Sequence, residues 1–210
     1  EQSDFGRQEL GGEMIAAVEG ALWSRALIER YRHMGAVPQA RRVIVAVDPP
    51  ASSSGDACGI VVAMLGVDGT AYVRADCSVT HATPERWARA VADAAHAWQA
   101  DRVVAEANQG GQMVASVLRA ADIALPVKLV HASRGKTARA EPIAALYEAG
   151  RVRHTGLFAA LEDEMCGLVA GGGYEGPGRS PDRADALVWA LHELMIVPAA
   201  NWRRPGVRSL

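Results

Sequence analysis

The sequence is poor in residues that bind soft metal ions, and the few it has are scattered. Its 210 residues include three cysteines and six histidines, and neither type shows the spacing of a zinc site. An odd number of cysteines without a pattern is typical of reduced, mostly buried thiols in an intracellular protein. They are Cys58, Cys77 and Cys166. We therefore expect no structural zinc.

The sequence also lacks the signatures of membrane insertion, of a protein nucleophile and of a phosphate-binding loop. No apolar run approaches the ~20 residues that span a bilayer. The first residues contain neither a signal peptide nor an initiator methionine, which indicates a piece of a longer protein. No Gly-x-Ser-x-Gly motif occurs, and residues 135–137 (GKT) lack the earlier glycine of a phosphate loop. With a net charge of −2, any basic surface must be local.

From about residue 41, strand-like segments are followed by an alternation of helices and strands. The Asp68-Gly69 pair is a hairpin signal, so the first three strands are expected to form an antiparallel meander. The expected strands are 42–48, 58–65, 71–78, 102–106, 127–130 and a short one at Val152. The expected helices are 84–98, 112–121, 137–149, 157–169 and 181–196. This order predicts an α/β fold with a mixed sheet and helices on both faces.

The first 40 residues differ from the rest because they are charged and carry no strand signal. Residues 13–32 show an apolar stripe at helical spacing, which predicts a helix. We interpret residues 1–40 as a helical arm or linker, residues 41–196 as the main domain and residues 197–210 as a tail. The tail is expected to be disordered or to contact a partner.

Two carboxylates stand where buried strands are expected to end. Asp48 closes the apolar run 43–47, although an aspartate before proline is also a common turn residue. Glu106 closes the run 103–105, where ordinary turn chemistry favours Asp, Asn or Gly. A glutamate at such a buried end needs a partner or a metal. Side-by-side strands would bring the two acids together.

Two more carboxylates, Asp182 and Asp185, open the last helix after Ser180 as N-cap and Pro181 as the first helical residue. Acids in a first turn are stabilised by the helix dipole, so a purely structural role is a real alternative. At ~100° per residue, Asp185 falls on the shoulder of the apolar stripe and Asp182 almost opposite it. Asp185 is therefore the stronger candidate, and Asp56 is a weak extra one.

Acidic oxygen donors without histidine or cysteine favour Mg²⁺ or Mn²⁺. Two such ions ~3.5–4 Å apart can activate a water on one side of a phosphorus and stabilise the leaving oxygen on the other. The pattern therefore predicts a metal-dependent phosphodiesterase. Arg134, Lys136 and Arg139 could hold phosphates without reading bases. A solvated helix start is the alternative for this basic segment.

Four stretches in this order resemble the C-terminal nuclease domain of large terminase subunits, the DNA-packaging motors of tailed phages and gene transfer agents. They are 45–49 (VAVDP), 104–111 (VAEANQGG), 136–142 (KTARAEP) and 180–187 (SPDRADAL). Each is weak alone, and the ordered set covers about residues 41–196. Residues 7–13 (RQELGGE) resemble the segment that joins the family's ATPase domain to its nuclease.

The resemblance implies a ribonuclease H-like fold and cleavage of concatemeric double-stranded DNA with little sequence preference. It implies Asp48, Glu106 and Asp185 as the metal-binding acids, and it leaves the role of Asp182 open. It also implies an ATPase domain of the same full-length chain, the portal and the small terminase subunit as partners, in the cytoplasm of a bacterial host cell.

Two other functions are compatible with the same residues. One is another ribonuclease H-like nuclease, such as a Holliday-junction resolvase or a transposase core. The glycine-rich loop 108–111 and the segment 7–13 favour the terminase instead. The other is a DNA-docking module that has kept the acids only as caps, which predicts no divalent-ion binding.

Overall fold

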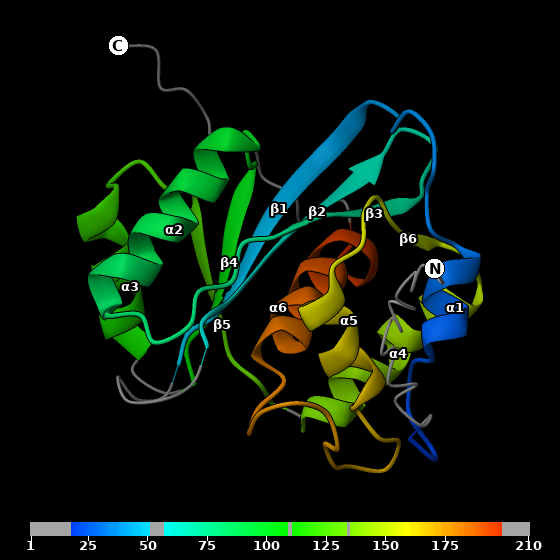
Figure 1. Ribbon diagram of the computed structural model, residues 1–210. Coiled ribbons are helices and arrows are strands. Elements are labelled where there is room, and N and C mark those ends of the chain that lie inside the picture. Colours follow the sequence, from blue (N-terminus) through cyan, green and yellow to red (C-terminus); the bar gives the residue numbers. More distant parts are fainter. Residues whose placement is uncertain (1–17, 51–56, 109–110, 134, 199–210) are drawn as a thin grey trace, which may run out of the picture.

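A six-stranded sheet with helices on both faces forms the body of the protein (Figure 1). The computed structural model describes residues 18–50, 57–108, 111–133 and 135–198. The strands are β1 Ala40–Asp48, β2 Gly59–Gly66, β3 Ala71–Asp76, β4 Arg102–Glu106, β5 Val127–Val130 and β6 Val152–His154. The helices are α1 Arg25–Arg30, α2 Pro84–Ala97, α3 Gly111–Ala121, α4 Lys136–Glu148, α5 Ala159–Cys166 and α6 Asp182–Leu191, followed by the π-helical turn η1 His192–Ile196.

The strand order is β5-β4-β1-β2-β3-β6, with the meander at its centre. Strands β1, β2 and β3 pair antiparallel. The later strands join in parallel, β4 on β1, β5 on β4 and β6 on β3. Gly69 has a φ of +78° in the turn between β2 and β3, which accounts for the Asp68-Gly69 signal. The predicted mixed sheet and its antiparallel meander are confirmed.

Each face of the sheet has its own apolar core. Val45 and Val47 of β1 pack with Trp87 of α2, in the layer formed by α2 and α3. Ile44 and Ala46 point the other way, into the core shared with α4, α5 and α6. Figure 1 shows α2 and α3 on one side of the sheet and the remaining helices on the other. Coverage on both faces explains why β1 and β2 are near-continuously apolar.

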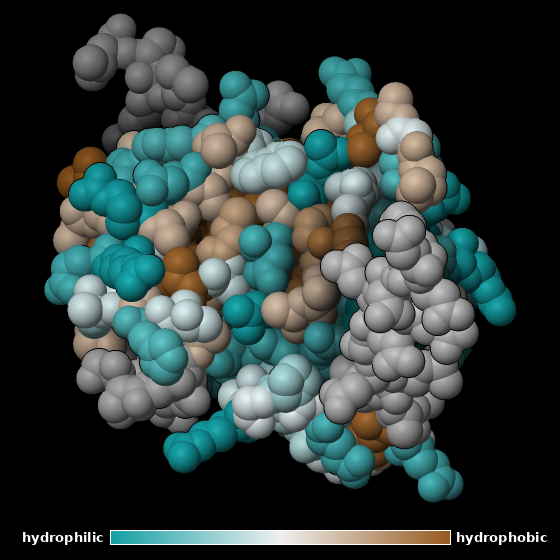
Figure 2. All heavy atoms as spheres, in the orientation of Figure 1, coloured by the Kyte–Doolittle hydropathy of each residue, from teal (hydrophilic) through white to brown (hydrophobic). Residues whose placement is uncertain are grey.

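The face of the protein drawn in Figure 2 carries both hydrophilic and apolar residues. In Figure 2 hydrophilic residues are spread over the face turned to the viewer, with smaller apolar patches between them. No helix in the described part of the chain is long and apolar enough to cross a membrane. The three cysteines are free, and Cys58 is fully buried among the apolar residues that cover the α2 face.

The segment before β1 differs from the helix expected over residues 13–32. Residues 1–17 lie outside the described part, and the helix begins only at Arg25, where the Ser24 side chain caps the amide of Leu27. Before it, the amide of Leu22 donates to the carbonyl of Leu168. Trp23 is buried against Tyr147. Tertiary contacts therefore replace the helix over residues 18–24, and the prediction is wrong there.

A buried carboxylate ties this segment to the domain. Glu162 of α5 accepts hydrogen bonds from Arg25 at 2.6 Å and from Arg32 at 2.9 and 3.0 Å. Nδ1 of buried His154 lies 2.9 Å from the same carboxylate, and its Nε2 lies 2.8 Å from the hydroxyl of Tyr147. These contacts fit a neutral imidazole that donates to Glu162 and accepts from Tyr147. We call these five side chains the Glu162 cluster.

The Glu162 cluster makes stability depend on pH. Burial raises the pKa of Glu162, but hydrogen bonds from His154 and Arg32 outweigh it and lower the pKa from 4.5 to about 2. Burial also lowers the pKa of His154 below its ordinary 6.5, against the pull of Glu162. Both pKa values are lower in the folded state than in the unfolded state. As the pH decreases, the unfolded state therefore binds protons first, and the free energy of unfolding decreases. The histidine contribution is lost below about pH 6.5, and that of Glu162 from about pH 4.5 towards 2.

We expect Glu162→Gln to lower the free energy of unfolding at pH 7 by about 3 kcal/mol, because two guanidinium groups lose a buried partner. The difference from wild type should shrink as the pH falls from 4.5 towards 2. Urea unfolding at several pH values measures both. Asp163→Asn is the control, because Asp163 pairs with Arg25 at the surface and should contribute less than about 1 kcal/mol. Equal losses for the two variants would contradict the special role of Glu162.

Candidate active site

Two of the predicted acids meet at one edge of the sheet because β1 and β4 are parallel neighbours. Asp48 is the last residue of β1 and Glu106 the last of β4. Their preceding residues, Val47 and Ala105, are paired in the register. The two carboxylates therefore leave the sheet side by side, as the strand ends predicted. Asp56, the weak extra candidate, lies outside the described residues.

Helix α6 brings the other two acids to the same edge. Asp185 is 2% exposed, and Asp182 is 8% exposed although helical arithmetic puts it almost opposite the apolar stripe. The reason is the close approach of α6 to β2. A Cβ at Gly59 would lie 1.9 Å from the backbone oxygen of Asp182, so only glycine fits there. Strand β2 therefore covers the side of α6 that the spacing of its apolar residues predicted to face solvent.

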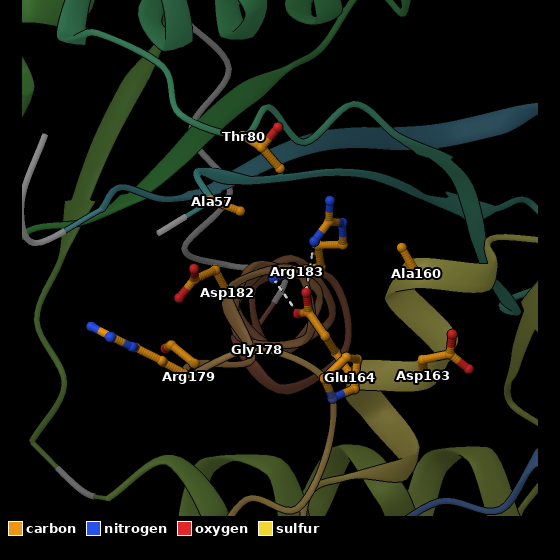
Figure 3. A pocket seen from close by; sticks show the side chains of 11 residues that line it. Ala57, Thr80, Ala160, Asp163, Glu164, Gly178, Arg179, Asp182 and Arg183 are labelled. Carbon is orange, nitrogen blue, oxygen red and sulfur yellow. Dashed lines mark hydrogen bonds and ion pairs between the residues drawn. The ribbon is translucent and has the colours of Figure 1, made fainter. Parts of the chain in front are cut away.

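The start of α6 is capped by a residue that the sequence did not indicate. Glu164 of α5 accepts from the amides of Arg183 at 2.7 Å and Ala184 at 3.2 Å. It also accepts from the guanidinium of Arg183 at 2.8 Å (Figure 3). The prediction that Ser180 is the N-cap is therefore wrong. The hydroxyl of Ser180 instead accepts a hydrogen bond from the ammonium of Lys136 at 2.9 Å. Glu164 caps a helix 18 residues later in the chain, which a local capping pattern cannot reveal.

Two cations from the first turn of α4 lie among the acids. Lys136 forms an ion pair with Asp185. Arg139 lies 3.0 Å from Glu106 and 3.7 Å from Asp185. Lys136 is 46% exposed, whereas Arg139 is only 9% exposed. Arg134, the third basic residue predicted to contact DNA, lies outside the described residues.

The cluster carries an excess of negative charge. Burial raises the pKa of Asp48 well above its ordinary value, and the nearby charges of Asp185 and Glu106 raise it further. Burial also raises the pKa of Asp185, although Lys136 and Arg139 oppose that shift. Burial lowers the pKa of Lys136, but Asp185 and Asp48 outweigh it and leave the pKa raised. Groups that repel one another in this way are stabilised by added positive charge.

These residues fit a hard divalent cation, because every acidic side chain at this edge offers carboxylate oxygens. Among the described residues, no group of three or more acidic, histidine or cysteine side chains is arranged so that it could hold a metal ion. Lys136 and Arg139 offset part of the negative charge of the acids.

The carboxylate of Glu106 is held by three side chains. Arg139 donates to it at 3.0 Å, the indole of Trp189 at 2.5 Å and the amide of Asn108 at 2.6 Å. Asn108 in turn accepts from the amide of Ala132 after β5. Trp189 is a residue of the site that the sequence did not predict. Its position four residues after Asp185, hence on the same side of the helix, was the available signal.

A cavity of about 560 Å³ opens beside Asp182. Helix α5, the start of α6 and the loop before α6 line it, together with Ala57 and Thr80. Figure 3 shows Asp182 and Arg179 at one end and Asp163 at the other, with Arg183 turned towards Glu164 between them. Acidic and basic side chains both line it, so the cavity suits no single charge.

The sheet order, with two acids at adjoining strand ends and a third on the helix that packs across them, defines a ribonuclease H-like fold. Residues 45–194 match the family model of the terminase RNaseH-like domain. The chain belongs to this family, which confirms the predicted resemblance. A comparison with curated proteins found no match.

Solved structures of terminase nucleases share the fold. The nuclease domain of the large terminase subunit of bacterial virus Sf6 has a TM-score of 0.64 at 15% identity, over 82% of this chain and 98% of that chain. The large terminase nuclease of thermophilic phage G20c with bound magnesium has a TM-score of 0.57 at 18% identity, over 82% and 97%. The large terminase of bacteriophage HK97 has a TM-score of 0.59 at 16% identity, over 82% of this chain but 43% of that chain.

The close approach at Gly59 gives a direct test of how the site is built. We expect Gly59→Ala to lower the free energy of unfolding by about 1–3 kcal/mol, because the added methyl overpacks the contact with Asp182. Urea unfolding measures this. Gly111→Ala is the matched control, since a Cβ there meets nothing within 4 Å. A Gly59→Ala protein as stable as wild type would show that the approach is not close.

Proposed function

We propose that this chain is a divalent-metal-dependent endonuclease that cuts concatemeric double-stranded DNA during genome packaging. The observation that carries the proposal is the convergence of Asp48, Glu106 and Asp185 on one sheet edge, from two parallel strand ends and one helix. Membership of the terminase family supports the same reaction. Asp182 is close enough to raise the pKa of Asp48, so it is a candidate auxiliary ligand.

In this proposal the carboxylates of Asp48, Glu106 and Asp185 hold Mg²⁺ or Mn²⁺, with two ions as the expected number. Bound there, the ions would supply positive charge for the phosphate oxygens and would lower the pKa of an attacking water. The water gives a proton to solvent as its oxygen bonds to phosphorus. The bond from phosphorus to the bridging oxygen breaks, and that oxygen takes up a proton from solvent. The reaction then needs no nucleophile from the protein, in keeping with the absence of a nucleophile motif.

The two cations of α4 have different parts in this mechanism. Lys136 is nearly half exposed, so its ammonium can reach a phosphate next to the carboxylates. Arg139 is buried and forms ion pairs with Glu106 and Asp185. Its role in this proposal is therefore to position these carboxylates and not to contact DNA. Contacts of this kind address the phosphate backbone, which supports cleavage with little sequence preference. A phosphate contact by Arg134 stays a prediction.

Membership of the terminase family also supports a proposal about partners. The chain spans 43% of the HK97 large terminase and nearly all of the Sf6 nuclease domain. We propose that the full-length protein also has an ATPase domain, connected through the segment before β1. The portal and the small terminase subunit are the expected partners, in the cytoplasm of the bacterial host.

Asp185→Asn tests the reaction, because it removes the charge and keeps the shape. We expect plasmid nicking in Mg²⁺ or Mn²⁺ to fall by at least ~100-fold, the usual loss when one such charge-stabilising group is removed. EDTA should abolish nicking by the wild type. Asp122→Asn, remote on the α2–α3 side, is the control and should cut normally. A wild type that leaves DNA intact in both metals would favour the non-catalytic docking module.

A second experiment addresses the DNA contact. Lys136→Ala should weaken binding to duplex DNA and reduce the slope of log K against log salt by about 1, because one phosphate contact is lost. Fluorescence anisotropy with chelator present measures binding without cleavage. Arg86→Ala, an exposed arginine on α2, is the matched control. An unchanged slope for Lys136→Ala would remove Lys136 from the DNA interface.

A further inference from the structure

The three hydrogen bonds to Glu106 are unevenly shared between its two oxygens. Oε2 accepts from the guanidinium of Arg139 at 3.0 Å and from the indole N–H of Trp189 at 2.5 Å. Oε1 accepts from the amide of Asn108 at 2.6 Å. A carboxylate oxygen has two lone-pair directions. Among the residues that the structure describes, partners therefore fill both directions of Oε2 and one direction of Oε1, which leaves the second direction of Oε1 open.

Trp189 connects this carboxylate to the other acids. Its ring is 7% exposed, and the guanidinium carbon of Arg139 lies 4.6 Å from the ring centroid. Arg139 thus stacks on the ring while it faces both Glu106 and Asp185. Because Trp189 and Asp185 lie four residues apart on α6, one rigid helix carries an acid and the group that orients another acid.

We propose that Trp189 is a positioning residue for the metal site. Its indole N–H and the stacked Arg139 fix Oε2 of Glu106, so that the open lone pair of Oε1 is the one offered to a divalent cation. The inference rests on the proposed function, because it assumes that Glu106 binds the ion. Trp189 touches neither the ion nor DNA in this scheme. Outer-shell partners that orient a ligand in this way typically affect metal affinity by about 10–100-fold.

Trp189→Phe removes the indole N–H and keeps an aromatic ring for Arg139 to stack on. We expect the affinity for Mn²⁺, measured by calorimetry on DNA-free protein, to fall by about 10-fold. Trp87→Phe is the control, because it makes the same change in the core beneath α2, and its affinity should equal that of wild type. Thermal unfolding of both variants shows that they are folded at the temperature of the titration.

A double-mutant cycle separates positioning from a general packing effect. In a Glu106→Gln background, Trp189→Phe should cause no further loss of Mn²⁺ affinity, since the group it orients no longer acts as an anionic ligand. An equal loss in both backgrounds would overturn the proposal. So would an unchanged affinity in Trp189→Phe alone.

The hydrogen bond itself can be observed without metal. The indole N–H resonance of Trp189, assigned by its disappearance in Trp189→Phe, should move when Glu106 becomes Gln in a two-dimensional NMR spectrum. A resonance that does not move would overturn the contact. If the wild type binds no Mn²⁺, the proposed function fails and this inference fails with it. Binding by wild type with no change in Trp189→Phe overturns the inference alone.

Discussion

The close approach of α6 to β2 is the constraint on which the rest of the site depends. With no side chain at Gly59, the first turn of α6 lies directly against the strand. Asp182 and Asp185 are thereby brought to the sheet edge where β1 and β4 end with Asp48 and Glu106. The helix axis that this contact sets also carries Trp189 to Glu106. The missing side chain at Gly59 therefore governs the position of three groups, Asp182, Asp185 and Trp189.

Such an approach has an electrostatic cost, because it buries like charges together. Burial and mutual repulsion both favour the protonated form of Asp48. The chain offsets this with Lys136 and Arg139, from a single turn of α4. The two cations differ in exposure and in partners. The accessible ammonium of Lys136 pairs with Asp185, whereas the buried guanidinium of Arg139 pairs with both Glu106 and Asp185. Asp182 and Asp185 are thus buried, and part of the negative charge of the cluster is compensated.

The sequence predicted those parts of the site that depend on where elements end. Apolar runs and a hairpin signal are local patterns, so they located Asp48 and Glu106 at strand ends and Asp185 at a helix start. The misses involve partners distant in the chain. Glu164 rather than Ser180 caps α6, and Leu22 pairs with Leu168 rather than continuing a helix. Helical arithmetic also placed Asp182 correctly on its helix without revealing the strand that covers it.

Helix α5 has a consequence for dissecting the protein into fragments. Its Glu162 holds Arg25 and Arg32, while Glu164, two residues on, holds the first turn of α6. A fragment trimmed to start at β1 would leave Glu162 without both guanidinium groups and the site of Trp23 unfilled. Residues 22–32 therefore pack as part of the domain, although they lie well upstream of the first strand. A boundary drawn from secondary structure alone would cut through the core.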